Sequence, residues 1–439
     1  MDKTDQRESA RMLRMLVDDL KKGMYVCQLD RPWLDSPFLL QGFPIHSDRE
    51  LEVLRQLCVY VFIDPERGHG AQARTPSKPS PSSLPKLEVR ESPALLTPPP
   101  TEPARFRQQM GRAARVRDRS HDYVRRTMEK VQLGHGVDTD EAREMVSALV
   151  EQVVEGPSAM VWMTQLRKRD AYTSIHSVNV CILALTFGRY MGLDTSLLNT
   201  LGLGALLHDI GKLRVPLEIL NKPGALSPKE FELMKTHPVE GHRLLLEDPN
   251  VPPAALDAVL HHHERNDGRG YPDGLGEGQI PVMTQMVSIV DIYDALCSHR
   301  AYHDGISAQE ALSRLYNMAG TGLDRELIQA FIRCVGIYPI GAVVELTTGQ
   351  VAVIVGLNEN QKLRPVVMLL READQHTPCA RQLMNLGSDV WRQHKDAPAV
   401  RRMLDPDELH LDMAGLIREQ LSRDNSRPHA PADLEEFNQ

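Results

Sequence analysis

The sequence predicts a multidomain, mainly α-helical protein, in which an all-α bundle lies between a small α+β domain and a small β appendage. Three observations predict this arrangement. Nine prolines between residues 71 and 103 separate a short N-terminal segment from the rest. From about Asp138 to Gly336 the apolar residues follow helical spacing with short breaks, and from Gly341 to Leu370 β-branched residues alternate.

The overall composition excludes several classes of protein. The 439 residues include 51 lysines and arginines against 59 acidic residues, a net charge of −8, which disfavours binding to a nucleic acid polymer. The most apolar stretch, Val178 to Phe187, is about half the ~20 residues that a membrane span needs, so we expect no membrane insertion. Six scattered cysteines form no CxxC pair, and the first residues lack a signal-peptide pattern. We therefore expect a cytoplasmic protein with reduced thiols.

Residues 1–68 are predicted to form the small α+β domain. Strand-like runs from Met24 to Leu29 and from Tyr60 to Ile63 flank one helix signal. Ser47 is a candidate N-cap, and Glu50 three residues later completes a capping box. Residues 69–104 follow as a Pro- and Ser-rich linker, because this composition buries too little apolar area to offset the entropy lost on ordering.

Residues 105–137 are rich in arginine, above all from Arg105 to Arg126, and are predicted to be a helical connector. The simplest interpretation is the solvated face of a helix or coiled coil, which could join two copies of the chain in a homodimer. A binding site for an acidic partner is the alternative.

Residues 138–336 are predicted to form the all-α bundle, because helix signals recur and no strand-like alternation of any length occurs. Gly156-Pro157 ends one helix, and Asp194 can cap another. Ser227 with Glu230 forms a capping box with proline at the first helical position, and Ser307 begins a second box.

The last part of the chain is predicted to contain strands. Residues 337–425 form the β appendage and a helix, with turns at Thr348-Gly349 and near Asn358. Residues 426–439 are rich in proline and acidic residues and are predicted to form a frayed tail.

The arrangement of histidines within the bundle indicates a metal site. Histidines and carboxylates recur at expected helix ends, about 25–35 residues apart, so one helical hairpin separates each group from the next. Imidazole with carboxylate suits Fe, Mn or Zn, and one carboxylate beside a histidine could bridge two ions. A single histidine at a helix end is more often a hydrogen-bonded structural residue, but five coordinated groups favour metal binding. The groups are His176, His208-Asp209, His237, His262-His263 and Asp291.

Two further features favour phosphate chemistry. Lys212 follows Asp209 by three residues, where its ammonium could neutralise a phosphate oxygen. The loop from Asn266 to Gly274 has three glycines around Tyr271 and Pro272, which is typical of a constrained loop that presents a side chain to a ligand. A turn that only closes a pair of helices is the alternative.

Five motifs in this order resemble the bacterial HD-GYP domain, a subclass of the HD metal-dependent phosphohydrolases known as cyclic di-GMP phosphodiesterases. The resemblance covers roughly residues 155–335, and the first sixty-odd residues are similar to the small domain often found ahead of HD-GYP. The motifs are YTSIHS (Tyr172–Ser177), HDIGK (His208–Lys212), KTHP (Lys235–Pro238), HHERNDGRGYP (His262–Pro272) and VDIYDAL (Val290–Leu296).

The resemblance implies a bundle of the HD type with two divalent ions, Fe or Mn, bridged by Asp209. Tyr172 stands where members with three metals carry a glutamate, which favours two ions. Asp209 and Lys212 are the implied catalytic residues, and Lys212 and Arg300 the implied contacts to substrate phosphate. Cys297 to His303 read CSHRAYH where the family usually has TSDRPYR. The implied metal ligands are His176, His208, Asp209, His237, His262, His263 and Asp291.

The resemblance also implies a function. Gly270, Tyr271 and Pro272 form the signature loop, which in the family is linked to substrate access and to GGDEF-domain partners. The expected reaction is hydrolysis of cyclic di-GMP to pGpG by a metal-activated hydroxide, with GMP as the product of a second round. Two alternatives stay open: a poorly active receptor or scaffold that binds cyclic di-GMP or GGDEF proteins, and an HD hydrolase of another phosphoester.

Overall fold

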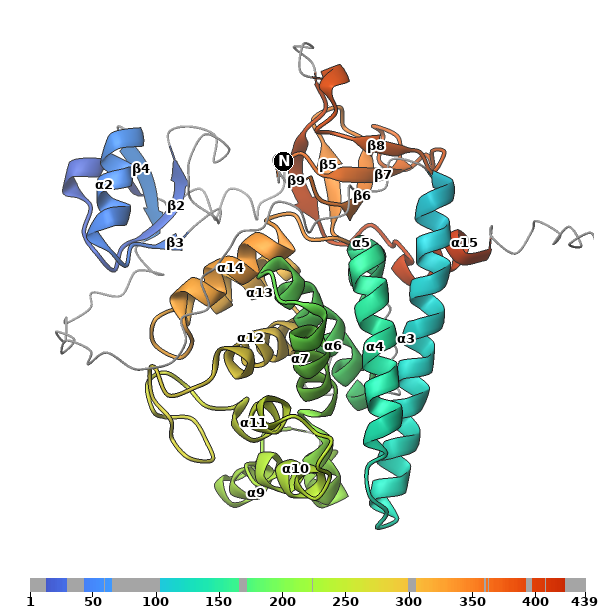
Figure 1. Ribbon diagram of the computed structural model, residues 1–439. Helices are drawn as coiled ribbons and strands as arrows, with labels where there is room; N and C mark the ends of the chain where they lie inside the picture. Colours follow the sequence, from blue (N-terminus) through green and yellow to red (C-terminus); the bar gives the residue numbers. More distant parts are fainter. Residues whose placement is uncertain are drawn as a thin grey trace, which may run out of the picture.

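The computed structural model shows a helical bundle with a small mixed domain at one side and a small sheet at one end (Figure 1). The bundle forms one continuous hydrophobic core with its long N-terminal helix. The residues described are 13–29, 43–58, 60–64, 103–165, 172–222, 224–298, 305–358, 361, 363–391, 397–406 and 408–422. The predicted linker and tail therefore lie almost entirely outside the described residues.

The N-terminal domain is an antiparallel sheet with one helix, as the sequence predicts. The strand order is β1-β4-β2-β3. Ser47 caps the helix, and its capping box with Glu50 is confirmed. The sequence missed β1 and β3, because a strand of two to four residues leaves too short an alternation to detect. The elements are β1 (Leu13–Leu16), η1 (Val17–Asp19), β2 (Tyr25–Leu29), β3 (Phe43–Pro44), α2 (Asp48–Leu57) and β4 (Tyr60–Asp64).

A contact joins the N-terminal domain to the bundle. The hydroxyl of Tyr316, on α13 (Ala308–Asn317), donates to Oε1 of Glu50 at 2.9 Å. The His46 ring lies 6.1 Å from the Tyr316 ring. The other carboxylate oxygen of Glu50 accepts the backbone N–H of His46 and of Ser47 at 2.7 and 2.8 Å. One carboxylate therefore both starts α2 and attaches the domain to the bundle.

We expect Tyr316→Phe to loosen this attachment. A partly buried hydrogen bond to a charged group contributes about 1.5–3 kcal/mol net, so amide exchange within residues 43–64 should rise roughly tenfold or more. Hydrogen-exchange mass spectrometry measures this. Tyr123→Phe is the matched control, because its hydroxyl donates to the Asp138 carbonyl inside the bundle. Equal amide exchange in Tyr316→Phe and the native protein would show that this hydrogen bond does not hold the N-terminal domain to the bundle.

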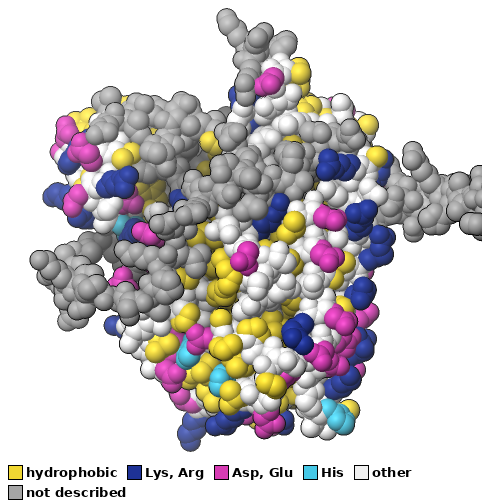
Figure 2. All heavy atoms as spheres, in the orientation of Figure 1, with side chains coloured by type: hydrophobic (Ala, Val, Ile, Leu, Met, Phe, Trp, Pro, Cys, Tyr) yellow, Lys and Arg dark blue, Asp and Glu magenta, His cyan; other side chains and the backbone are white. Residues whose placement is uncertain are grey.

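The arginine-rich segment forms α3 (Pro103–Gln132), a helix of 30 residues. It lies beside α4 (Thr139–Glu155) and also contacts α5 (Pro157–Met163), α6 (Tyr172–Tyr190) and the C-terminal helix α15 (Met413–Ser422) (Figure 1). Phe106, Met110 and Tyr123 on its inner face are buried. Most of its arginines occupy the outer face, where basic side chains follow the edge of the molecule (Figure 2). Arg117 is the exception, since its side chain is 11% exposed and donates to the Met163 carbonyl. Two of them pair with the bundle, Arg112 with Glu155 and Arg126 with Glu141.

The central part is all α-helical, and no named strand occurs among its described residues. Asp194 and Ser307 accept the backbone N–H three residues on, and Ser227 forms its full capping box with proline at the start of the helix. The helices are α4 (Thr139–Glu155), α5 (Pro157–Met163), α6 (Tyr172–Tyr190), α7 (Thr195–Leu207), η4 (Ile210–Arg214), α8 (Leu217–Leu220), α9 (Pro228–Met234), α10 (His237–Leu246), α11 (Pro253–His261), α12 (Val282–Cys297), α13 and α14 (Arg325–Val335).

The most apolar segment of the sequence is the middle of the bundle. Val178 to Leu185 on α6 are buried among α7, α12 and α4. The apolar run is therefore explained by burial on all sides of one helix. Within the described ranges, no helix is long and apolar enough to cross a membrane.

The C-terminal part is a five-stranded antiparallel sheet in the order β8-β7-β6-β5-β9, followed by a helix that packs against α3. Gly349 makes the tight turn between the first two strands with φ of 86°. Both faces of β5 and β6 are buried, although the sequence had suggested alternation. The elements are β5 (Val343–Leu346), β6 (Val351–Gly356), β7 (Val366–Arg371), β8 (Leu383–Asn385), η5 (Asp389–Trp391), β9 (Val400–Leu404) and α15 (Met413–Ser422).

Candidate metal centre

The five groups predicted from the sequence converge at one place in the bundle. His176 lies on α6, His208 and Asp209 follow α7, and His237 is the first residue of α10. His262 and His263 follow α11, and Asp291 lies on α12. His176, His208, Asp209, His237 and His262 are each at most 2% exposed. Elements that are far apart in the sequence thus place all seven predicted ligands in a single buried cluster.

Three of the histidines are oriented by the same kind of hydrogen bond to the backbone. Nδ1 of His208, His237 and His262 each lies 2.7 to 2.9 Å from the backbone carbonyl three residues earlier. Because a carbonyl oxygen only accepts, each Nδ1 carries the proton. Each Nε2 is therefore left with a lone pair directed to the centre of the cluster, as a metal ligand requires. The helix ends supply these carbonyls because the last carbonyls of a helix have no partner within it.

His176 is held differently, by two carboxylates of α12. Its Nδ1 lies 2.7 Å from Oδ2 of Asp294, and its Nε2 lies 2.9 Å from Oδ1 of Asp291. Asp294 is itself held by Asn179 at 3.2 Å and by the Ser298 hydroxyl at 3.3 Å. Asp294 was not predicted as a site residue from the sequence. Its spacing of three residues after Asp291 was the available signal, since such residues share a helix face.

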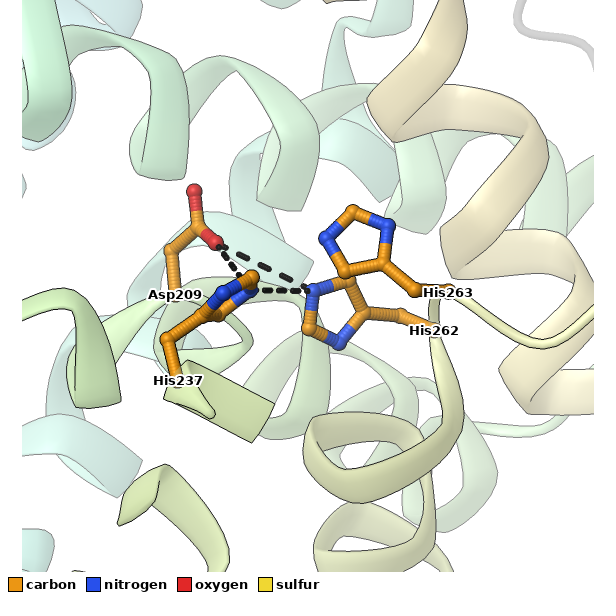
Figure 3. Close-up of side chains that lie close together, drawn as sticks. All are labelled: Asp209, His237, His262 and His263. Carbon is orange, nitrogen blue, oxygen red and sulfur yellow. Dashed lines mark hydrogen bonds and ion pairs between the residues drawn. The ribbon is translucent and has the colours of Figure 1, made fainter. Parts of the chain in front are cut away.

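Asp209 divides its two oxygens between two groups of histidines. Oδ2 lies 3.3 Å from Nε2 of His208 and 3.9 Å from Nε2 of His176. Oδ1 lies 3.4 Å from Nε2 of His237 and 3.8 Å from Nε2 of His262 (Figure 3). Two sets of possible metal-binding atoms, each within 4.8 Å of one another, therefore share this carboxylate: His176, His208 and Asp209; and Asp209, His237, His262 and His263.

The donor atoms fit divalent metal ions. Nε2 of His208 and Oδ1 of Asp209 are buried and make no hydrogen bond within the described part of the chain. A buried polar atom without a partner is costly unless a ligand or ion satisfies it. Imidazole and carboxylate without thiolate suit Fe, Mn or Zn in a reactive site better than a structural zinc.

The electrostatics of the cluster favour the protonation states that bind metals. Burial raises the pKa of Asp209, but Lys212 and His208 outweigh it and hold this pKa well below its usual range. At Asp291 the hydrogen bond to His176 likewise outweighs burial and keeps the pKa low. Burial lowers the pKa of His262 well below 6.5 and that of His263 to about 3. Anionic carboxylates and neutral imidazoles are the forms that coordinate metal ions.

His176 is the exception. Burial lowers its pKa, but the hydrogen bonds to Asp291 and Asp294 outweigh burial and raise this pKa to about 9. The imidazolium then lies between two carboxylates, which compensates the buried charge.

Lys212 and the glycine-rich loop border the cluster. Nζ of Lys212 lies 2.5 Å from Oδ2 of Asp209. The Tyr271 ring stacks on the His263 ring, with centroids 4.7 Å apart and planes at 30°. A Cβ at Gly270 would overlap the backbone of Glu264 and Arg265, so only glycine fits there. Pro272 follows Tyr271 in the loop, and Arg300 lies outside the described residues.

Glu264 shapes this loop and was also missed from the sequence. Its buried carboxylate accepts the backbone N–H of Asp273, Gly274 and Leu275 at 2.6 to 2.9 Å. Its position directly after the two histidine ligands was the available signal. His261, on the other side of those ligands, points away from the cluster and bonds Asp257 and Asp273.

We expect Glu264→Gln to disorder the loop. The amide group replaces one acceptor oxygen with a donor that faces a backbone N–H, which costs about 1–3 kcal/mol. Amide exchange at residues 273–275 should rise roughly tenfold or more. Glu277→Gln is the matched control, because Glu277 is an exposed residue near the same loop. Unchanged exchange in Glu264→Gln would contradict this role.

Comparison with known proteins agrees with the family resemblance that the sequence motifs indicate. The family model described as "HD domain" matches residues 156–327, and a model described as a domain of unknown function, DUF3391, matches residues 13–142. The chain is 36% identical over 381 residues to the protein of Pseudomonas aeruginosa named cyclic di-GMP phosphodiesterase PA4108, covering 85% of this chain and 89% of that protein. This chain belongs to the HD-GYP family.

Other relatives match a shorter part of the chain. A cyclic di-GMP phosphodiesterase of Thermotoga maritima is 38% identical over 167 residues, covering 38% of this chain and 45% of that protein. A 3'3'-cGAMP-specific phosphodiesterase of Vibrio cholerae is 31% identical over 176 residues, covering 40% of this chain and 41% of that protein. In this HD-GYP protein the DUF3391 match includes α3 as well as the N-terminal domain.

Proposed function

We propose that this chain is a metal-dependent phosphodiesterase that hydrolyses cyclic di-GMP to pGpG and so lowers the level of this second messenger. The observation that supports the proposal most is the position of Asp209, whose two oxygens face two different pairs of histidines. Such a carboxylate suits two divalent cations a few ångströms apart, an arrangement that hydrolyses phosphodiesters. The relative that matches 85% of the chain is itself named a cyclic di-GMP phosphodiesterase.

The proposed cofactors are two divalent ions, Fe or Mn. When bound, they supply an activated water and positive charge that screens the phosphodiester. Asp209 would fix the separation of the two sites. The proposed ligands are His176, His208, Asp209, His237, His262, His263 and Asp291.

Lys212 and the GYP loop are the proposed contacts to substrate. The Lys212 side chain is 23% exposed, so its ammonium is accessible beside the centre and would neutralise a non-bridging phosphate oxygen. Tyr271, with Gly270 and Pro272, would form the wall of the site next to His263. Arg300 is proposed as a second phosphate contact. Water attacks phosphorus in line, the bond to the ribose 3′ oxygen breaks, and that oxygen leaves with a proton.

Three further proposals concern the setting of the reaction. The GYP loop would also contact GGDEF-domain proteins, and the exposed face of α3 would join two chains in a homodimer. A mass in solution that stays that of one chain at high concentration would contradict the homodimer. The cytoplasm is the proposed location, since the six cysteines form no disulfide in the described structure, which suits a reducing compartment.

The decisive experiment combines metal analysis with product analysis. The full chain is purified without oxygen, its metals are quantified by mass spectrometry, and products are separated after incubation with cyclic di-GMP or 3'3'-cGAMP. Near two Fe or Mn per chain, with pGpG or GMP as product, would support the proposal. Metal-loaded protein without product from cyclic di-GMP would contradict it. Faster hydrolysis of 3'3'-cGAMP would assign the chain to the other substrate that its relatives' names include.

A further inference from the structure

We propose that Lys235 and Phe231 form an outer subsite that binds the second phosphodiester of the cyclic dinucleotide and one of its guanines. This inference rests on the proposed function, because it concerns the part of the substrate that lies away from the metal centre. Neither residue belongs to the proposed ligand set or to the GYP loop.

The two side chains lie together on one side of α9. Lys235 caps the C-terminal end of this helix and follows Phe231 by four residues, so both face the same way. Nζ of Lys235 lies 5.0 Å from the centre of the Phe231 ring and 5.8 Å from the centre of the Tyr271 ring. The ammonium thus lies beside two aromatic rings, one from α9 and one from the GYP loop.

A continuous series of contacts leads from the cluster to this ammonium. The rings of His262 and His263 have centroids 4.2 Å apart, and the Tyr271 ring stacks on His263 at 4.7 Å. Lys235 lies next to Tyr271, and its backbone leads within two residues to His237, another residue of the cluster. Lys235 and Phe231 therefore lie at the rim of the centre, adjacent to the loop that borders it.

The charge of Lys235 is available to a ligand. Its carboxylate partner is Glu232, at 2.7 Å, and the side chains of Lys235 and Glu232 are 31% and 69% exposed. An ion pair with this exposure stabilises a protein little, so it yields readily to an anionic ligand. Lys212 differs, because its ammonium already contacts the buried Asp209 at the centre itself.

The chemistry of the substrate matches both side chains. A cyclic dinucleotide carries two phosphodiester anions, and when one is at the metal centre the other needs a separate cation. It also carries two purine bases, which stack on aromatic rings. Phe231 is 45% exposed, so its ring face is accessible to a base. A surface lysine that only covers apolar area with its alkyl stem is the alternative explanation.

The test measures KM and kcat of the metal-loaded full chain with cyclic di-GMP, and binding of its non-hydrolysable bis-phosphorothioate analogue by calorimetry. We expect Lys235→Met to raise KM and the analogue's Kd about tenfold, with a smaller change in kcat, because it removes a charge-assisted contact to bound substrate. Lys235→Arg should restore most of the affinity. Glu232→Gln should lower KM, since it removes a negative charge that competes with the phosphate.

Lys222→Met is the matched control, because Lys222, in the loop before α9, is 35% exposed and pairs with Glu230 of α9 at 2.6 Å. It should leave KM unchanged. Equal KM and Kd for Lys235→Met and the native protein would overturn the subsite while the enzyme still turns over cyclic di-GMP. Failure of the proposed function gives a different result: the native chain would hydrolyse the small diester bis(4-nitrophenyl) phosphate but neither bind nor hydrolyse cyclic di-GMP.

Discussion

Asp209→Ala should abolish both metal loading and hydrolysis of cyclic di-GMP. The carboxylate faces both groups of histidines, so its loss removes a ligand from each site at once. It also leaves the Lys212 ammonium, 2.5 Å away, without the carboxylate that compensates its charge. We expect metal content to fall from about two ions per chain to nearly none, and turnover to fall at least ~10³-fold, which corresponds to about 4 kcal/mol of lost transition-state stabilisation.

The measurements are metal quantification by mass spectrometry and product chromatography on the same preparation. Asp257→Asn is the matched control: Asp257 pairs with His261 on α11, close to the cluster but directed away from it. The control should retain its metals. Near-normal hydrolysis by Asp209→Ala would contradict both the role of Asp209 as a ligand of the two metal sites and the proposed reaction.

Asp294→Asn should weaken one of the two metal sites selectively. Asp294 bonds Nδ1 of His176, which belongs to the group with His208 and Asp209. Its hydrogen bonds among the described residues are to His176, Asn179 and Ser298, none of which is in the other group. Loss of a carboxylate that orients a histidine ligand typically costs 10–100-fold in metal affinity. After dialysis against limiting metal we therefore expect about one ion per chain instead of about two, with recovery of activity when the metal concentration is raised.

Ser298→Ala should have the same effect as Asp294→Asn, but a smaller one. The Ser298 hydroxyl donates to the same carboxylate at 3.3 Å, a longer contact than the 2.7 Å between Asp294 and His176. Its removal should weaken the same site by less than Asp294→Asn. Loss of both ions together in Asp294→Asn, or full occupancy at limiting metal, would show that Asp294 does not act through His176.

The helix starts were predictable because they depend on local chemistry. Ser47, Asp194 and Ser227 each accept a backbone N–H three residues on, which the sequence pattern alone indicates. The short strands β1 and β3 were not predictable, since their pairing partners are distant and their length gives no periodicity. The two-sided burial of β5 and β6 likewise depends on what covers the sheet, which no local pattern encodes.

The candidate ligands were predictable as a set because metal chemistry restricts them to a few residue types. Their division into two groups around the two oxygens of Asp209 required the packing of α6, α7, α10, α11 and α12 against one another. The same is true of Asp294 and Glu264, whose roles depend on the atoms they meet: the Nδ1 of His176 in one case and three backbone N–H groups in the other.

The sequence by itself thus determined the helical class, most helix starts and the chemical identity of the metal-binding side chains, because each of these follows from residues within one turn or one motif. The tertiary structure alone decided which oxygen faces which histidine, which carboxylate orients His176, and that Lys235 lies beside Tyr271. Several of those contacts join residues 28 to 118 positions apart, such as Asp209 with His237 and His176 with Asp294. Only the packing of the buried helices brings such distant residues within bonding distance, and local patterns do not record it.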